Sequence, residues 1–264
     1  MQSLFFKQRR FPMNETVLFA RSGAVARIVL NNPQRHNSLG EAELLQLQEY
    51  VARVAADEAC RVLVITGRGD RTFCAGAALN QLGAGQISGE LFEATTNGIA
   101  ALKIPSICAL NGSVYGGGVE LALACDFRVG IENTVLRVPA AGIGLCYPIS
   151  GINRFVECLG VSISKRILLA AEEFDATCMR EIGFLDYLVS AQQLEAKTSD
   201  LAASMVGLAP LAVRAMKQII NDAAAGQLDR VAALALAQQC AISDDLQEGF
   251  AAQREKRPPQ FSGR

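Results

Sequence analysis

A glycine-rich segment in the middle of the chain carries the strongest chemical signal. Residues 111–126 read Asn-Gly-Ser-Val-Tyr-Gly-Gly-Gly-Val-Glu-Leu-Ala-Leu-Ala-Cys-Asp, between an apolar run and an apolar helical pattern. Glycines let the backbone approach a ligand closely, and the free N–H groups of a helix N-terminus favour negative charge. Such a turn can bind a phosphate or stabilise an oxyanion. Close packing of the helix against its neighbours explains the glycines equally well.

The position of these glycines argues against a dinucleotide site. A dinucleotide fold needs Gly-x-Gly-x-x-Gly directly after the first strand, with an acidic residue about 20 positions further on. Here Gly116, Gly117 and Gly118 are contiguous and follow several predicted strands. An anion site of another kind, for a phosphate or an oxyanion, and close packing of the helix both stay open.

Glu120 follows Gly117 by three residues, on the first turn of the same predicted helix. A carboxylate there could exchange a proton with water or with a carbon atom of a substrate. The alternative is a purely structural charge that complements the helix dipole, worth about 0.3–1 kcal/mol.

A second segment reads Arg-Thr-Phe-Cys-Ala-Gly-Ala-Ala-Leu-Asn-Gln over residues 71–81, also directly after an apolar run. The two segments together resemble the enoyl-CoA hydratase/isomerase, or crotonase, family. The resemblance extends from Val17 to Phe261 and includes further short matches. These are Asn32-Pro33 with Asn37 nearby, Arg180-Glu181-Ile182-Gly183 followed by Val189, Asp244 ahead of Glu248-Gly249, and Glu255-Lys256-Arg257-Pro258.

The resemblance implies an acyl-CoA-processing enzyme of fatty acid metabolism that stabilises a thioester enolate. The two backbone donors would be the amides of Ala77 and Gly117, and Glu120 would be one of two glutamates of the hydratases. Removal of one such donor costs about 2.7–4 kcal/mol of transition-state stabilisation. The substrate would be carried as a coenzyme A thioester, and no prosthetic group or metal ion is implied.

The resemblance also implies contacts with coenzyme A. The residues at the matching positions are Arg35, His36, Asn37, Ala75, Gly76, Leu79 and Lys256. Arg35 or His36 would lie near a phosphate, and Lys256 near the nucleotide. A solvated loop and a solvated terminal charge are the alternatives.

One position departs from the hydratase pattern. The second glutamate should follow Pro139, but Ala140 stands there, and no Asp or Glu occurs between Glu132 and Glu157. Tyr147 lies in the same loop, which resembles that of methylmalonyl-CoA decarboxylase, although that relative has a histidine at the place of Ala77. A decarboxylase-like lyase with Tyr147 in catalysis and a weakly catalytic CoA-ester-binding protein therefore stay open. Tyr147 as a packed aromatic residue is an equal alternative.

The elements that must position these residues follow an alternating order. Strands are predicted over Val17–Phe19, Val25–Leu30, Arg61–Thr66, Ser106–Leu110 and Phe127–Gly130, and helices over Glu41–Asp57 and Gly118–Ala124. Continuous apolar runs indicate parallel strands that are buried on both faces. From about Ser162 the pattern is helical. The resemblance implies an α/β, crotonase-type (ClpP/crotonase-like) spiral of ββα units with a C-terminal helical region.

Composition and charge limit the other possibilities. Half of the 264 residues are hydrophobic, 19% are charged, and the formal net charge is -1. This balance favours neither nucleic acid nor an anionic membrane as a partner. The eight cysteines lack metal-binding spacing, which indicates buried free thiols and a cytoplasmic location.

We expect a three-part organisation. Residues 1–12 form a leader that we expect to be disordered, 13–200 the crotonase core with the acyl-CoA site, and 201–264 a helical segment. The last segment is expected to cover the site and to contribute to a homotrimer or hexamer, as the resemblance implies.

Overall fold

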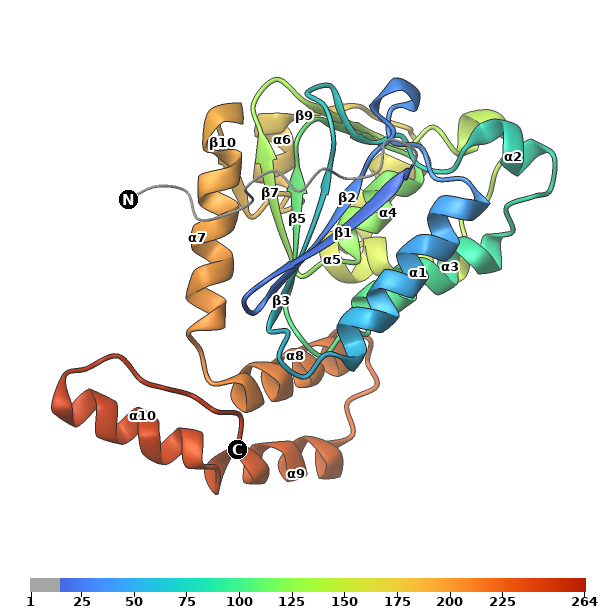
Figure 1. The fold of residues 1–264 in the computed structure, drawn as a ribbon. Coiled ribbons are helices and arrows are strands. Elements are labelled where there is room, and N and C mark those ends of the chain that lie inside the picture. The colour runs from blue at the N-terminus through green and yellow to red at the C-terminus, as the bar shows by residue number, and fades with distance from the viewer. Residues whose placement is uncertain (1–14) are drawn as a thin grey trace.

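Strands of two sheets alternate along the chain in the computed structural model, which describes residues 15–264 (Figure 1). The predicted leader therefore lies outside the described residues. The larger sheet has the order β1-β2-β3-β5-β7-β10 and the smaller one the order β4-β6-β8-β9. The larger sheet comprises β1 (Val17–Ser22), β2 (Val25–Leu30), β3 (Val62–Gly67), β5 (Ser106–Leu110), β7 (Phe127–Ile131) and β10 (Tyr187–Val189). The smaller sheet comprises β4 (Thr72–Cys74), β6 (Ser113–Tyr115), β8 (Val135–Arg137) and β9 (Phe174–Asp175).

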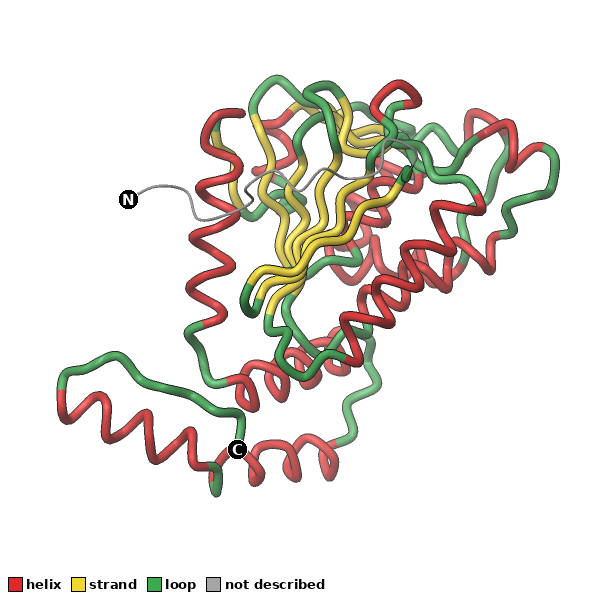
Figure 2. The backbone as a smooth tube through the Cα atoms, viewed as in Figure 1, coloured by secondary structure: helices red, strands yellow, loops and turns green. Residues whose placement is uncertain are grey.

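The central strands confirm the prediction from continuous apolar runs. In β5 all five residues are buried, and in β3 the first five are. From β2 to β10 the neighbours pair in parallel, whereas β1 and β2 form an antiparallel hairpin. Strands buried on both faces need helices on both sides, and Figure 2 shows helices flanking the sheet.

Helices fill the connections between these strands. They are α1 (Glu41–Ala56), α2 (Leu79–Gly83), α3 (Gly89–Ala100), α4 (Gly117–Leu123), α5 (Ile149–Leu168), α6 (Ala176–Glu181) and α7 (Leu194–Val206), with 3-10 turns η1 (Pro33–Arg35), η2 (Ala141–Ile143) and η3 (Ala191–Gln193). Helices α1 and α3 pack together, and α7 contacts β3, β5 and β7. Helix α5 is kinked at Gly160, where φ is 76°.

The short strands of the smaller sheet were not predicted. Each has two or three residues, too few for a periodic pattern. Strands β4, β6 and β8 each follow a strand of the larger sheet after a brief loop, whereas β9 follows α5. The prediction of purely helical structure after about Ser162 was also wrong for β9 and β10. Strand β10 gains its partner only from β7, which lies more than 50 residues earlier.

The last helices extend away from the sheets (Figure 1). They are α8 (Pro210–Ala224), α9 (Arg230–Ala241) and α10 (Asp244–Glu255). Lys217 of α8 is buried and donates hydrogen bonds to Asp126 Oδ2 at 2.7 Å and to the Ile104 carbonyl at 2.9 Å. These bonds join α8 to the body of the chain, whereas α9 has no buried residue.

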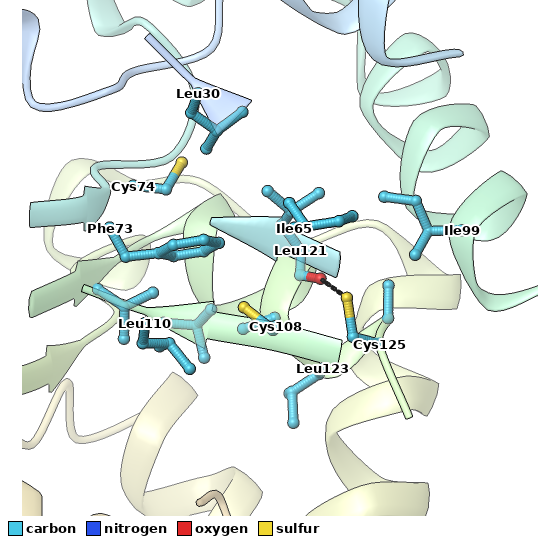
Figure 3. Close-up of a cluster of buried hydrophobic side chains, with 14 of the residues drawn as sticks. Leu30, Ile65, Phe73, Cys74, Ile99, Cys108, Leu110, Leu121, Leu123 and Cys125 are labelled. Atoms are coloured by element: carbon cyan, nitrogen blue, oxygen red, sulfur yellow. Dashed lines mark hydrogen bonds between the residues drawn. The ribbon is translucent and has the colours of Figure 1, made fainter. Parts of the chain in front are cut away.

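The hydrophobic core lies between the larger sheet and the helices α1, α3, α4 and α5. Figure 3 shows part of it, where Cys108, Cys125 and Leu121 lie close together and Cys125 Sγ donates to the Leu121 carbonyl at 3.8 Å. The eight cysteines are free. The prediction of burial is confirmed for four of them and is wrong for Cys146 and Cys158, which are exposed.

Candidate active site

The two glycine turns meet in space. Gly76 lies in the loop after β4, and Gly117 begins α4 after β6. A Cβ atom on Gly76 would lie 2.5 Å from the Gly117 nitrogen, and Gly76 has a φ of +83°. Only glycine permits this conformation and this approach. Parallel pairing of β4 with β6 brings the two loops to the same edge of the smaller sheet.

Two backbone amides remain available at this junction. The Ala77 N–H donates no hydrogen bond to another described residue. Gly117 is the first residue of α4, so its N–H has no acceptor within the helix. Two hydrogen bonds hold the backbone on either side of Ala77. The Leu39 amide donates to the Gly76 carbonyl and the Ala78 amide donates to the Leu39 carbonyl, each at 2.8 Å. We call the Ala77 and Gly117 amides the oxyanion pair.

The Phe92 ring borders the oxyanion pair. A Cβ on Gly117 would collide with the Phe92 ring, and a Cβ on Gly118 would lie 2.5 Å from the Cys74 carbonyl. Both glycines are therefore required by close packing around the helix start. Phe92 is buried on α3 and belongs to the hydrophobic core.

Glu120 lies on α4 with no exposed surface. Its Oε1 accepts hydrogen bonds from Thr96 Oγ1 at 2.9 Å and from Arg154 Nη1 at 3.2 Å. Burial raises the pKa of Glu120 above its ordinary value of 4.5, and the bonds to Thr96 and Arg154 offset part of that rise. A buried carboxyl with a raised pKa and a held orientation is suited to proton transfer.

The partners of Glu120 were not predicted from the sequence. Arg154 is buried on α5 and also donates to Asn97 Oδ1 at 2.7 Å, so it links α5 to α3 and α4. An arginine on a face shared with Gly151 and Phe155 is a weak signal of a buried ion pair. Thr96 carries no such signal, because threonine within a helix is common.

The loop that contains Ala140, where the resemblance predicts a second glutamate, borders the site on the α5 side. The small Ala140 is buried at 7% exposure. The Tyr147 ring packs edge-on against Phe155, with 5.7 Å between ring centroids, and its hydroxyl oxygen is buried without a hydrogen-bond partner among the described residues. A Cβ on Gly151 would lie 2.9 Å from Glu120 Oε2 and 3.1 Å from Tyr147 Cδ1. Glu120 and Tyr147 thus both lie beside Gly151.

The residues predicted to contact coenzyme A lie in three parts of the structure. His36 and Ala75 lie beside the oxyanion pair, because the Ala75 amide donates to the His36 carbonyl at 3.0 Å. Arg35 lies at the end of η1, and Leu79, which begins α2, is 66% exposed. Lys256 ends α10, in the segment that extends away from the sheets.

Asn37 is a structural residue of this loop. It is buried, its Nδ2 contacts the carbonyls of Thr72 at 2.9 Å and Phe73 at 3.1 Å, and its Oδ1 accepts from the Asn32 amide at 2.9 Å. These bonds fix the η1 loop against β4 and thereby position Arg35 and His36. His36 Nδ1 lies 2.9 Å from Thr72 Oγ1 and reinforces the same junction.

Residues 15–264 contain no cluster of His, Cys, Asp or Glu side chains that could hold a metal ion. Within the same range, every helix is too short or too polar to cross a bilayer.

Comparisons with known proteins show the family to which the chain is similar. A family model described as enoyl-CoA hydratase/isomerase matches residues 20–264. The chain is 30% identical to a crotonyl-CoA hydratase of Syntrophomonas wolfei over 254 residues, covering 94% of this chain and 98% of the relative. It is 31% identical to the 2,3-dehydroadipyl-CoA hydratase of Escherichia coli over 259 residues, covering 96% and 100%.

Solved structures give the same result. An enoyl-CoA hydratase from Bacillus anthracis superposes with a TM-score of 0.87 at 29% identity, over 95% of this chain and 100% of that one. An α/β fold with a C-terminal helical region, as predicted, is therefore confirmed as the crotonase fold. The family match over nearly the whole chain also makes it an acyl-CoA enzyme, and the chain belongs to the enoyl-CoA hydratase/isomerase family.

Proposed function

We propose that the oxyanion pair binds the thioester oxygen of an acyl-CoA and stabilises the enolate that forms during the reaction. The approach of Gly76 to the Gly117 nitrogen carries this proposal, because it brings the two turns into contact at one point. Backbone donors aimed at a developing oxyanion in a dry site act without reorganisation. They also depend little on side-chain identity, so the replacement at Ala140 leaves them unchanged.

Glu120 is the proposed acid and base of the reaction. It lies one helical turn beyond Gly117, and its Oε2 accepts no hydrogen bond from the described residues while Oε1 is held. A fixed carboxyl with one free oxygen can move a proton between the solvent-derived nucleophile and the carbon next to the thioester.

Hydration is the first candidate reaction, since relatives of similar length are named hydratases. A decarboxylase-like lyase of the methylmalonyl-CoA decarboxylase type is the second, and a weakly catalytic CoA-ester-binding member the third. Ala140 motivates both alternatives, because it supplies no second carboxylate. Tyr147 would orient a substrate carboxylate in the decarboxylase.

The coenzyme A moiety is proposed to cross the η1 loop. Arg35 is exposed there, and Ala75, Gly76 and Leu79 line the path from the loop to the oxyanion pair. Asn37 supports this path through its bonds to the carbonyls of β4 rather than by contact with the cofactor. Lys256 belongs to the C-terminal segment, so we assign its contact to a coenzyme A molecule in an assembled oligomer.

The chain is proposed to act in the cytoplasm as a homotrimer or hexamer. Helices α8, α9 and α10 expose large apolar side chains, including Ile220, Val231, Leu234, Ile242 and Phe250. Exposed apolar surface of this extent is typical of subunit contacts. In this arrangement residues 13–200 form the catalytic core, and 201–264 cover the site of a neighbouring subunit.

An exchange experiment tests the proposed enolate chemistry. We expect the protein to exchange the C2 protons of butyryl-CoA with deuterium in D2O, as followed by NMR. Glu120→Gln should slow the exchange by about 100-fold or more, since it removes the proton acceptor. Glu132→Gln, an exposed glutamate after β7, is the matched control and should exchange at the unmodified rate.

Substrate assays distinguish the candidate reactions. A hydratase removes the enoyl absorbance of crotonyl-CoA, whereas a decarboxylase releases carbon dioxide from a malonyl-type CoA and leaves crotonyl-CoA unchanged. A binding protein would do neither. Absence of both exchange and turnover would reject the enzymatic proposal.

A further inference from the structure

Three buried oxygen atoms at the α5 side of the site have no hydrogen-bond partner. Among the described residues, the buried side-chain oxygens in this condition are Glu120 Oε2, Tyr147 Oη and Ser150 Oγ. An unpaired buried polar group destabilises the folded chain, so proteins rarely keep one without a ligand or ordered water. Glu120 lies on α4, Ser150 in the first turn of α5 and Tyr147 in the loop before it, and the three atoms together indicate a polar ligand.

These atoms come from residues that are held near one another. The carboxyl of Glu120 and the Tyr147 ring both lie beside Gly151, because a Cβ atom there would be 2.9 Å from Glu120 Oε2 and 3.1 Å from Tyr147 Cδ1. Ser150 directly precedes Gly151 in the first turn of α5. Phe155 fixes the Tyr147 ring, and Arg154 with Thr96 fixes Oε1 of Glu120.

The chemistry of the three groups is complementary to a hydroxyl group. Burial, and then the charge of Glu120, raise the pKa of Tyr147 well above its ordinary value of 10, so the phenol stays protonated and donates. Ser150 can also donate, and the Glu120 carboxylate accepts. An O–H group offers one proton and two lone pairs, which matches two donors and one acceptor. A ligand carboxylate offers no proton to Glu120 and carries the same charge.

We propose that Tyr147 and Glu120, with Ser150 as a second donor, hold the water molecule that adds to a 2-enoyl-CoA thioester, or the 3-hydroxyl group of the product. This inference rests on the proposed function, because the thioester must occupy the oxyanion pair. It names the substrate class as 2-enoyl and 3-hydroxyacyl thioesters. Tyr147 is a positioning residue that replaces the missing carboxylate at Ala140.

One carboxyl group suffices to balance this addition. Glu120 Oε2 accepts a proton from water as the water oxygen bonds to C3, and the C2–C3 π electrons move onto the thioester oxygen as an enolate. The enolate then takes the same proton from Glu120 at C2, which restores the thioester carbonyl and the carboxylate. The net change is one water added, with no other reactant.

Variants of the two hydroxyl residues test the proposal. Tyr147→Phe should lower kcat for crotonyl-CoA hydration by about 10- to 100-fold, the effect of losing one donor in a dry site, with KM changed by less than about threefold. Ser150→Ala should have a smaller effect in the same direction. Tyr187→Phe, in the edge strand β10, is the control and should leave kcat unchanged.

Rescue and exchange separate this role from a structural one. Ala140→Glu in the Tyr147→Phe background should recover about tenfold of the lost kcat, because a carboxylate again orients the water. Hydration should also fall about tenfold more than C2 proton exchange of butyryl-CoA in Tyr147→Phe, since exchange needs no oriented water at C3.

Several outcomes would overturn the inference while the proposed function stands. These are C2 exchange without any hydration of crotonyl-CoA, hydration by Tyr147→Phe at the unmodified rate, and decarboxylation of a malonyl-type CoA that depends on Tyr147. Absence of exchange as well as turnover would instead reject the proposed function itself. Hydration that depends on Tyr147 and is rescued by Ala140→Glu would support both.

Discussion

At the scale of residues, Gly76 is the position on which the oxyanion pair depends most directly. Its φ is positive, and its missing Cβ makes room for the Gly117 nitrogen. A larger residue at position 76 would therefore both strain the backbone and collide with Gly117. A glycine with a similar positive φ but with open space around it separates backbone strain from collision. Gly85 meets that condition, with φ +71° and no atom within 4 Å of a Cβ.

We expect Gly76→Ala to lower kcat/KM for the thioester substrate by about 100-fold, because displacement of Gly117 removes a donor. We expect a loss of stability of about 1–3 kcal/mol from the strained backbone. Gly85→Ala should show the strain without the loss of activity. Steady-state kinetics and urea unfolding measure both quantities, and equal activity in the two variants would argue against the oxyanion pair.

The pH dependence of activity is also decided by single residues. The pKa of Glu120 is raised by burial and lowered by Thr96 and Arg154. A base must be ionised, so activity should be lost as pH falls through the raised pKa, which lies above 4.5. The ionised form is disfavoured by folding, so for Glu120 stability is greatest at acid pH and decreases as pH rises from the unfolded to the folded pKa.

Arg154→Met should move the acid limb of the kcat/KM profile to higher pH, because it removes a cation that favours the carboxylate. A shift of about one pH unit corresponds to about 1.4 kcal/mol of lost charge stabilisation. Arg166→Met, which breaks an exposed ion pair of the same helix with Glu172, should leave the limb in place. An unshifted limb in Arg154→Met would exclude Glu120 as the titrating base.

At the scale of elements, a buried cation on α8 bonds this helix to the core. Lys217 is 9% exposed and bonds to Asp126, which in turn accepts from the Ser106 amide at 2.7 Å and from the Ser106 hydroxyl at 2.8 Å. The network joins α8 to the start of β5. Removal of one member leaves a partly buried carboxylate without its counter-ion.

Lys217→Met should lower the free energy of unfolding by about 3 kcal/mol, the lower end for breaking a buried pair, since Asp126 keeps its bonds to Ser106. Lys165→Met, an exposed lysine of α5, should change it by less than about 0.5 kcal/mol. Urea unfolding gives both values. Equal stability of the two variants would mean that α8 is held by apolar packing alone.

At the scale of the whole molecule, the C-terminal helices are the least self-sufficient part of the chain. Helix α9 buries none of its residues, while Val231 and Leu234 are 78% and 68% exposed. Helix α10 is joined to the following chain by Asp245, which accepts from the Ser262 amide at 2.7 Å and the Gly263 amide at 2.9 Å. The exposed apolar surface of these helices supports the proposed contact with a partner subunit.

We expect the protein to sediment as a trimer or hexamer, and Leu234→Glu to shift it toward the monomer, because a charge in an apolar contact is costly. Gln239→Glu adds the same charge at an exposed polar position of α9 and should not change the assembly. Analytical ultracentrifugation measures the mass. A monomeric unmodified protein would contradict the predicted oligomer.

The sequence by itself determined the family, the central parallel strands and the two glycine turns. These features are local. A continuous apolar run predicts the burial of its own strand, and glycines predict the backbone conformation of their own turn. The role of Glu120 and the contacts with coenzyme A stay predictions. The sequence shows that Ala140 departs from the hydratase pattern, but it does not show how this changes the reaction.

Only the tertiary structure decided which residues surround Glu120. Thr96, Arg154 and Tyr147 come from three separate segments, and no spacing along the chain relates them to α4. The short strands β4, β6, β9 and β10 likewise exist because partners distant in sequence supply their hydrogen bonds. The raised pKa of Glu120 and its unpaired Oε2 result from burial and from contacts with distant parts of the chain, rather than from the residues next to it in the sequence.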